Sequence, residues 1–400
     1  MTDPTHDLAT ELIHHPYTPP AGFAAPQPAL HRASTVIFPN TAALRARSWK
    51  SRAGYTYGLH GTPTTFTLEE RIASLEGGLQ TLLVPSGLAA IALVDMALLR
   101  SGDEVLIPDN AYGPSKELAR HELAAWGITH RFYDAMDPGS LSDAIGPRTR
   151  LVWLEAAGSV TMEFPDLMAL VRLARERGVL TALDNTWGSG VAFKAFDLDG
   201  SAPGTLGVDI CMHALTKYPS GGGDILMGSV TTRDEDLHLR LKATHMRMGW
   251  GVSGDDAERL LRALPTLALR YAAHDRTARE LAQWWTGQAC AVQVLHPAFT
   301  GSPGHEHWAR LCTHSAGLFS IVFDERWSSR QVDAFVDGLR LFKLGYSWAG
   351  PVSLVVPYDL KTMRDRPAWN GTLVRFSIGL ESAQALIADS AQALVAAGMG

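Results

Sequence analysis

The sequence has few cysteines, and no two of them stand close together. Its 400 residues contain three, Cys211, Cys290 and Cys312, an odd number spread too widely for a disulfide framework or a CxxC motif. A chain that folds without disulfides suits a reducing compartment. We therefore expect a cytoplasmic protein whose cysteines pack as small apolar side chains.

The sequence also lacks an excess of positive charge and a long apolar run. Its 35 Lys and Arg residues against 41 Asp and Glu residues give a net charge of −6, so no global basic field attracts nucleic acid or anionic membranes. The longest apolar run, 88–99, is interrupted by Asp95 and is too short to cross a bilayer. The acidic first residues contain no apolar segment of the kind found in secretory signals. We expect neither a nucleic acid nor a membrane as partner.

Motifs that bind metal ions are missing as well. The 15 histidines are scattered, and no HExxH motif or Cys/His quartet occurs. His305 and His307 lie two residues apart without a third ligand in view. The sequence therefore predicts no metal site.

What is present is an ordinary globular composition on a long chain. With 46% hydrophobic and 19% charged residues, 400 residues favour two domains or one large α/β domain. Residues 1–60 are rich in proline and have no helical period, which predicts an extended arm. We expect residues 61–258 to form a cofactor-binding domain and residues 259–400 a smaller C-terminal domain.

From about residue 66, helical and strand-like segments alternate. The expected helices are 68–75, 86–99, 115–125 and 166–178, and the expected strands are 81–84, 104–107, 130–133, 151–154 and 179–183. This alternation predicts an α/β fold with a largely parallel sheet. After Pro297 the pattern predicts a smaller α+β unit, with strands at 317–323 and 373–378 and helices at 329–338 and from about 382.

Three strand ends carry polar groups where open α/β sheets bind ligands. Ser86 and Gly87 begin a helix, whose free N–H groups favour a phosphate. Asp184 ends a strand and suits a cationic partner such as a protonated ring nitrogen. Lys217 follows a strand and precedes a glycine run, where partial desolvation makes an amine nucleophilic. Each feature alone has a plainer explanation, as a helix cap, a turn cap or a surface charge.

Together, in this order, the three features match what pyridoxal 5′-phosphate (PLP) requires. The wider sequence resembles the Cys/Met-metabolism PLP enzymes of fold type I, most of all the bacterial cystathionine β-lyases. The matching blocks run from about residue 55 to 380: Tyr57-Gly-Leu-His-Gly-Thr, Leu75-Glu-Gly-Gly, Pro85-Ser-Gly-Leu-Ala-Ala, Asn110-Ala-Tyr-Gly-Pro-Ser, Gly158-Ser-Val-Thr-Met-Glu, Asp184-Asn-Thr-Trp-Gly-Ser-Gly, Thr216-Lys-Tyr, His296-Pro-Ala, Gly304-His-Glu, Tyr346-Ser-Trp-Ala-Gly and Arg375-Phe-Ser-Ile-Gly-Leu-Glu.

The resemblance implies roles for residues around the cofactor ring. Lys217 corresponds to the lysine that forms the Schiff base with PLP. Asp184 corresponds to the partner of the pyridine nitrogen. Tyr112 is implied to stack on the ring and to take part in catalysis. Without the resemblance, Tyr112 would be read as an ordinary packed aromatic.

The resemblance also implies a phosphate site shared between subunits. Ser86, Gly87, Leu88 and the Thr216 hydroxyl would surround the phosphate. Tyr57 would reach the phosphate of a neighbouring subunit, which accounts for the extended arm. A homotetramer with shared active sites follows from the same resemblance.

The substrate side is implied by a C-terminal set of residues. Arg375 corresponds to the clamp for the α-carboxylate of the substrate, a task for which a planar guanidinium is well suited. Ser347 and Trp348 lie in the loop that helps to hold this carboxylate. Trp348 is the weakest of these assignments, since a Trp near a cleft is often only packed there.

Three positions depart from the family pattern. Leu59 stands where the family has a phosphate-site arginine, which predicts weaker retention of PLP, and the adjacent His60 is a candidate to replace part of the missing charge. Gly222 stands where a histidine is usual, and Val352 where a glutamate is frequent. None of the three touches the Schiff-base chemistry.

The reaction implied is β-elimination on an amino acid. Lys217 would remove the α-proton, with Tyr112 a candidate to assist transaldimination or departure of the thiolate. For L-cystathionine the products are homocysteine, pyruvate and ammonia, a step of methionine biosynthesis.

The residues leave several reactions open. Within the family they are cystathionine γ-lyase, cystathionine γ-synthase or methionine γ-lyase chemistry, and a broad cysteine-S-conjugate β-lyase. The non-enzymatic alternative is a regulatory or binding protein with the PLP-enzyme fold. The combination of Lys217, Asp184 and Arg375 argues against this non-catalytic role.

Overall fold

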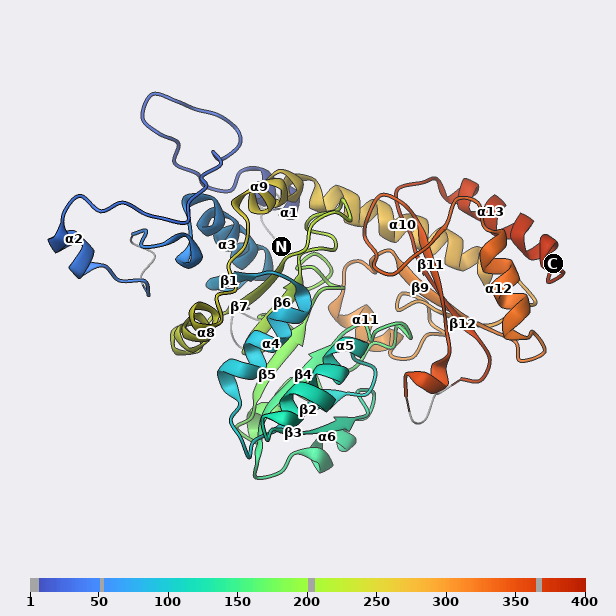
Figure 1. Ribbon diagram of the computed structural model, residues 1–400. Helices are drawn as coiled ribbons and strands as arrows, with labels where there is room; N and C mark the ends of the chain where they lie inside the picture. Colours follow the sequence, from blue (N-terminus) through green and yellow to red (C-terminus); the bar gives the residue numbers. More distant parts are fainter. Residues whose placement is uncertain (1–6, 51–53, 201–205, 365–368) are drawn as a thin grey trace.

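Two β-sheets organise the chain, one built from residues 80–232 and the other from residues 291–377. The computed structural model describes residues 7–50, 54–200, 206–364 and 369–400. The two sheets and their helices form two units that lie side by side, joined by the long helix α10 (Leu267–Trp285) (Figure 1).

The larger sheet has seven strands in the order β1-β7-β6-β5-β4-β2-β3. β7 is antiparallel to β1 and β6, and the other neighbours are parallel. The predicted α/β class with a mostly parallel sheet is therefore confirmed. The strands are β1 (Gln80–Val84), β2 (Glu104–Pro108), β3 (Thr129–Tyr133), β4 (Thr149–Glu155), β5 (Leu180–Asp184), β6 (Ile210–Ala214) and β7 (Gly228–Thr232).

Both faces of this sheet are covered, which explains its continuous apolar strands. In β4, Leu151 and Trp153 face one core while Val152 and Leu154 face the other, as the two-residue period of a strand requires. The helices α4 (Gly87–Leu98) and α8 (Glu235–Met248) cover the first face, and α3 (Pro63–Glu76) and α7 (Leu167–Glu176) the second.

Helix starts follow side-chain caps that are visible in the sequence. Asp166 accepts the Ala169 N–H at 3.1 Å and starts α7, and Ser382 does the same for α13 with the Ala385 N–H at 3.2 Å. The helix expected at 115–125 is α5 (Gly113–Leu118) followed by a π-helical turn, Ala119–Leu123. The remaining helices are α1 (Leu8–Ile13), α2 (Thr41–Ala46), α6 (Pro138–Ala144), α9 (Gly254–Ala263), α11 (His305–Leu311), α12 (Ser329–Gly338) and α13 (Ala383–Ala396), with short 3₁₀ turns η1 (Gly58–His60), η3 (Leu264–Thr266) and η4 (Leu360–Thr362).

The smaller sheet has five strands in the order β10-β11-β12-β9-β8. They are β8 (Ala291–Leu295), β9 (Leu318–Phe323), β10 (Lys343–Leu344), β11 (Leu354–Tyr358) and β12 (Leu373–Ser377). One face packs on α10, α12 and α13 around the fully buried Trp285. Because α10 contributes to the cores of both units, the expected division at residue 258 stays a prediction.

Within the described residues 7–50 and 54–60, the chain is mostly without regular structure, apart from α1, α2 and η1. In Figure 1 the blue chain around α2 extends away from both sheets. Among the described helices, none is both long enough and apolar enough to cross a membrane.

Candidate active site

The carboxyl ends of β1, β5 and β6 lie together in the larger sheet, and each carries a predicted site residue. At the end of β1, the Ser86 hydroxyl caps α4 by accepting the Ala89 N–H at 3.0 Å. A Cβ atom on Gly87 would lie 2.7 Å from the Cβ atom of Ala214 at the end of β6. Glycine therefore allows the start of α4 to pack directly on the strand that leads to Lys217.

Lys217 follows β6, and its side chain reaches toward the smaller sheet. Nζ donates to the Ser347 hydroxyl at 2.6 Å and lies 5.2 Å from the centre of the Trp348 ring. Burial, and then the charge of Arg375, lower the pKa of Lys217 to about 8, while Asp184 opposes the shift. The neutral fraction of this amine near physiological pH is thus larger than that of an exposed lysine.

Asp184 is the last residue of β5, beside Glu155 of β4 and Met212 of β6. Its Oδ1 accepts the Thr186 N–H at 3.0 Å. Burial raises the pKa of Asp184, and the Thr186 hydrogen bonds together with the charges of His213 and Lys217 act against that increase. A cationic partner would stabilise the charged form of this buried carboxylate.

Tyr112 stands at the start of α5, where its N–H donates to Glu155 Oε2 at 2.8 Å. Its side chain is 42% exposed. Burial, followed by the charges of Asp184 and Glu155, raises the pKa of the Tyr112 hydroxyl, so it keeps its proton at neutral pH. Burial likewise raises the pKa of Glu155 well above its ordinary value.

The smaller sheet contributes Arg375 from the middle of β12. This side chain is buried, its Nη2 donates to the Ser347 carbonyl at 3.3 Å, and its guanidinium lies 5.5 Å from the centre of the Tyr358 ring. Its Nε atom is buried and has no hydrogen-bond partner. A buried cation with a free donor fits an anionic ligand that completes the site.

Thr216, Leu88 and Tyr57 are the remaining predicted site residues. The Thr216 hydroxyl donates to the Met227 carbonyl at 3.3 Å. Leu88 lines a cavity together with Ala111 and Gly113, on either side of Tyr112. Tyr57 is 47% exposed, and its ring lies edge-on to His60 with ring centres 6.0 Å apart.

The three departures from the family pattern lie in different places. Leu59 and His60 line a cavity beside Lys242 and His245 of α8. A Cβ atom on Gly222 would come within 2.4 Å of Asp224 Oδ1. Val352 is exposed.

A buried polar cluster that the sequence pattern does not predict lies beneath the site. Glu76 at the end of α3 contacts His213 Nε2, and its Oε2 accepts from Asn185 Nδ2 at 3.0 Å and Cys211 Sγ at 3.3 Å. Burial opposes the charge of Glu76, but His213 and Asn185 hold its pKa below the ordinary value. Glu76, Cys211 and His213 offer ligand atoms within 4.8 Å of one another, and here Cys211 and His213 both contact the Glu76 carboxylate. The sequence gives one hint of this cluster: His213 is a polar residue within the otherwise apolar strand β6.

These residues fit PLP. A buried amine with a lowered pKa, a carboxylate at a strand end and a glycine-started helix meet within one region, and the unpartnered Arg375 Nε suits a substrate carboxylate. The chemistry of the donor set matches an anionic cofactor with a cationic ring nitrogen.

Comparison with known proteins gives a consistent result. A family model described as Cys/Met metabolism PLP-dependent enzyme matches residues 9–395. A cystathionine beta-lyase of Bordetella avium is 38% identical, over 98% of this chain and 99% of the relative. A cystathionine beta-lyase of Escherichia coli is 33% identical, over 96% of each chain.

Among solved structures, cystathionine gamma synthase from Xanthomonas oryzae pv. oryzae in complex with cystathionine is similar to the whole chain. The TM-score is 0.88 at 30% identity, covering 98% of this chain and 99% of the other. The fold is therefore shared by relatives with β-lyase and γ-synthase names, and the distinction between these reactions rests on the site.

Proposed function

The chain belongs to the Cys/Met metabolism PLP-dependent enzyme family, and from this premise we propose that it is a carbon–sulfur β-lyase that cleaves L-cystathionine. The products are homocysteine, pyruvate and ammonia. One observation carries the proposal: Lys217 and Arg375 both donate hydrogen bonds to Ser347. Lys217 Nζ donates to the Ser347 hydroxyl, and Arg375 Nη2 donates to the Ser347 carbonyl. Because both side chains contact Ser347, this observation supports a proton-accepting amine and a carboxylate clamp that act on the same substrate.

In this proposal the cofactor is held from several sides. Lys217 would attach it covalently, Asp184 would keep its ring nitrogen protonated, and Tyr112 would stack on the ring. The phosphate would be held by Thr216 and by the start of α4, residues 86–88. Bound PLP supplies an electron sink for the negative charge that forms at the substrate α-carbon.

The residues of the chain then handle the substrate and its protons. Arg375 binds the α-carboxylate through its guanidinium. Once the substrate amine has taken its place on the cofactor, the freed Lys217 Nζ would remove the α-proton, which a pKa of about 8 permits near neutral pH. The Cβ–S bond breaks with its electron pair on sulfur, and Tyr112 Oη is the candidate to protonate the leaving thiolate. Water then supplies the oxygen of pyruvate as ammonia leaves.

We further propose a cytoplasmic homotetramer that acts in methionine biosynthesis. The three free cysteines suit a reducing compartment. Tyr57 is exposed, and the chain around α2 extends away from both sheets (Figure 1), which together support a site completed by a neighbouring subunit, where Tyr57 would reach the phosphate.

Product analysis tests the reaction. The purified protein is supplied with PLP and L-cystathionine, and pyruvate plus homocysteine is the expected pair. The pair 2-oxobutyrate plus cysteine would instead establish γ-elimination. Lys217→Ala is the matched control and should release neither pair.

Two further measurements separate γ-synthase and broad β-lyase activity from the proposed reaction. Condensation of cysteine with an activated homoserine ester would indicate γ-synthase chemistry, and faster turnover of cysteine S-conjugates than of L-cystathionine would indicate a broad β-lyase. A protein that binds no PLP and shows no visible absorbance band would contradict the enzymatic function altogether.

A further inference from the structure

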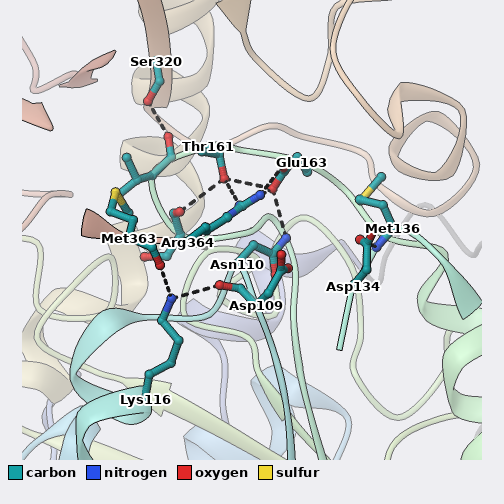
Figure 2. Close-up of polar contacts among 12 residues, drawn as sticks. Asp109, Asn110, Lys116, Asp134, Met136, Thr161, Glu163, Ser320, Met363 and Arg364 are labelled. Atoms are coloured by element: carbon teal, nitrogen blue, oxygen red, sulfur yellow. Dashed lines mark hydrogen bonds and ion pairs between the residues drawn. The ribbon is translucent and has the colours of Figure 1, made fainter. Parts of the chain in front are cut away.

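A buried ion pair joins the two units close to the candidate site. Arg364 follows η4 in the connection between β11 and β12. Its Nη1 donates to Glu163 Oε1 at 2.7 Å and its Nη2 to Glu163 Oε2 at 2.6 Å. The side chains of Arg364 and Glu163 are 8% and 5% exposed. Figure 2 shows this two-point contact at the centre of a polar network.

Glu163 contacts both Arg364 and the segment that contains Tyr112. Its Oε2 also accepts from Asn110 Nδ2 at 3.1 Å and from the Thr161 hydroxyl at 2.8 Å. The Asn110 carbonyl accepts the Ser159 N–H at 2.8 Å, so both its side chain and its main chain are tied to the loop after β4. Asn110 stands two residues before Tyr112.

Lys116 anchors the same segment on the other side of Tyr112. Its Nζ donates to the Met363 carbonyl and to the Asp109 carbonyl, each at 2.9 Å. The Met363 carbonyl therefore contacts the segment 109–116 directly at Lys116, after Tyr112, and the Arg364 side chain reaches it indirectly at Asn110, before Tyr112, through Glu163 (Figure 2). Two adjacent residues of one unit are thus linked to one loop of the other.

Tyr112 has only a main-chain contact of its own with the sheet. Its N–H donates to Glu155, its side chain makes no capping hydrogen bond, and the residue as a whole is 42% exposed. The direction of the ring thus depends on where the backbone of residues 109–116 is held. We propose that Arg364, through Glu163 and Asn110, is a positioning residue for Tyr112, with Lys116 as the second anchor. This inference rests on the proposed role of Tyr112 against the cofactor ring.

A gain in folding stability does not explain why a buried ion pair such as Arg364–Glu163 is present. Desolvation offsets much of the attraction between buried charges, so apolar side chains of similar volume can stabilise a fold as well or better. What an apolar pair cannot do is fix the carboxylate that Asn110 needs as acceptor. The bidentate geometry provides that fixed orientation.

The test is a double-mutant cycle on the affinity of the apo form for PLP, measured by absorbance titration. Tyr112→Ala should weaken binding about 10-fold, as loss of an aromatic contact does. Arg364→Met should weaken it about 3- to 10-fold. Because Arg364 acts through Tyr112, adding Arg364→Met to Tyr112→Ala should cause no further loss. Additive losses, or unchanged binding by Arg364→Met, would overturn the inference.

A second variant separates positioning from folding. The pair Arg364→Met with Glu163→Met replaces both charges by apolar groups, so its melting temperature should return toward that of the wild type while PLP binding stays weak. Recovery of PLP affinity together with stability would overturn the proposal. Arg310→Met, which breaks the exposed pair with Asp166, is the matched control and should bind PLP normally.

The outcomes also distinguish the role of Tyr112 from that of its anchors. If Tyr112→Ala binds PLP as the wild type does, the proposed role of Tyr112 fails and the positioning role fails with it. If Tyr112→Ala weakens binding but Arg364→Met and Lys116→Met do not, only the positioning role of Arg364 and Lys116 is wrong.

Discussion

At the scale of single residues, the ionisation of Lys217 links the fold to the proposed chemistry. An exposed lysine amine is almost fully protonated at neutral pH and accepts no proton from a substrate. Burial and the nearby Arg375 favour the neutral amine, and Asp184 limits the effect. The pKa that results, about 8, lies close to the pH at which a general base is efficient.

We predict that capture of PLP by the apo protein depends on pH through Lys217. The neutral amine is the nucleophile, so the rate should rise with pH around a midpoint near 8. Stopped-flow absorbance between about pH 6 and 10 measures it. In Arg375→Met the midpoint should move upward because a positive charge near the amine is lost. A midpoint as high as that of an exposed lysine, about 10.4, would contradict the prediction.

Asp95 is a second residue whose charge the fold disfavours. It lies in α4 with its Oδ1 accepting from Trp153 Nε1 at 2.8 Å, and burial raises its pKa to about 7. Because the folded-state pKa exceeds the unfolded one, the stabilising contribution of the neutral acid is complete below about pH 4 and is lost as the pH rises through 7.

Asp95→Asn should therefore stabilise the protein at pH 8 and not at pH 4. The amide oxygen can still accept from Trp153, and the buried charge is gone, so the expected gain at pH 8 is about 1 to 3 kcal/mol. Urea unfolding at the two pH values measures this gain. Asp333→Asn, at an exposed position of α12, is the control. An equal gain at both pH values would mean that ionisation of Asp95 is not the cause.

At the scale of elements, the start of α4 serves two purposes at once. The Ser86 hydroxyl satisfies the Ala89 N–H, while the other free N–H groups and the helix dipole remain available for the phosphate. Ser86 is thus a structural cap by its side chain, and only the main chain of residues 86–88 is left for the cofactor.

Two substitutions at Ser86 should separate these purposes. Ser86→Ala loses the cap and should lower the free energy of unfolding by about 1 kcal/mol. Ser86→Asp keeps a capping oxygen but adds a negative charge beside the phosphate, so stability should hold while PLP binding weakens. Thermal unfolding of the apo protein and PLP titration measure the two effects. Unchanged PLP affinity in Ser86→Asp would place the phosphate elsewhere.

Most elements of the larger sheet could be predicted from sequence because their local signals agree. The segment at 179–183 is apolar, is bounded by Gly178 and Asp184, and forms β5. β7 (Gly228–Thr232) carries no such signal, since its Gly, Ser and Thr residues are typical of a loop as well. It is a strand because β1 and β6 bind it on both sides, a contact between distant segments that no local pattern contains.

At the scale of the whole molecule, the N-terminal segment raises the question of assembly. Tyr57 contacts His60 of its own chain, and the chain around α2 extends away from both sheets. If Tyr57 completes the site of a neighbour, two chains inactive for different reasons should restore each other in part.

We predict such complementation between Tyr57→Ala and Lys217→Ala chains. A mixed dimer contains one site with both residues intact and one with neither, so purified mixed dimers should show about half of the wild-type activity. Differently tagged chains, co-expressed, purified for mixed assemblies and assayed for pyruvate release, provide the measurement. Mixed assemblies no more active than the parents would mean that Tyr57 serves its own subunit.

The sequence by itself determined the class of fold, the family and the residues at the strand ends, because these depend on local periodicity and on short motifs such as Asp184-Asn-Thr-Trp and Thr216-Lys-Tyr. Only the tertiary structure decided which distant groups share an environment. Glu76 meets His213, and Arg364 meets Glu163 across 201 positions of sequence. Such pairs form when packing brings buried polar side chains together, since a buried polar group without a partner is costly. The spacing of these residues in the sequence therefore does not predict that they are in contact.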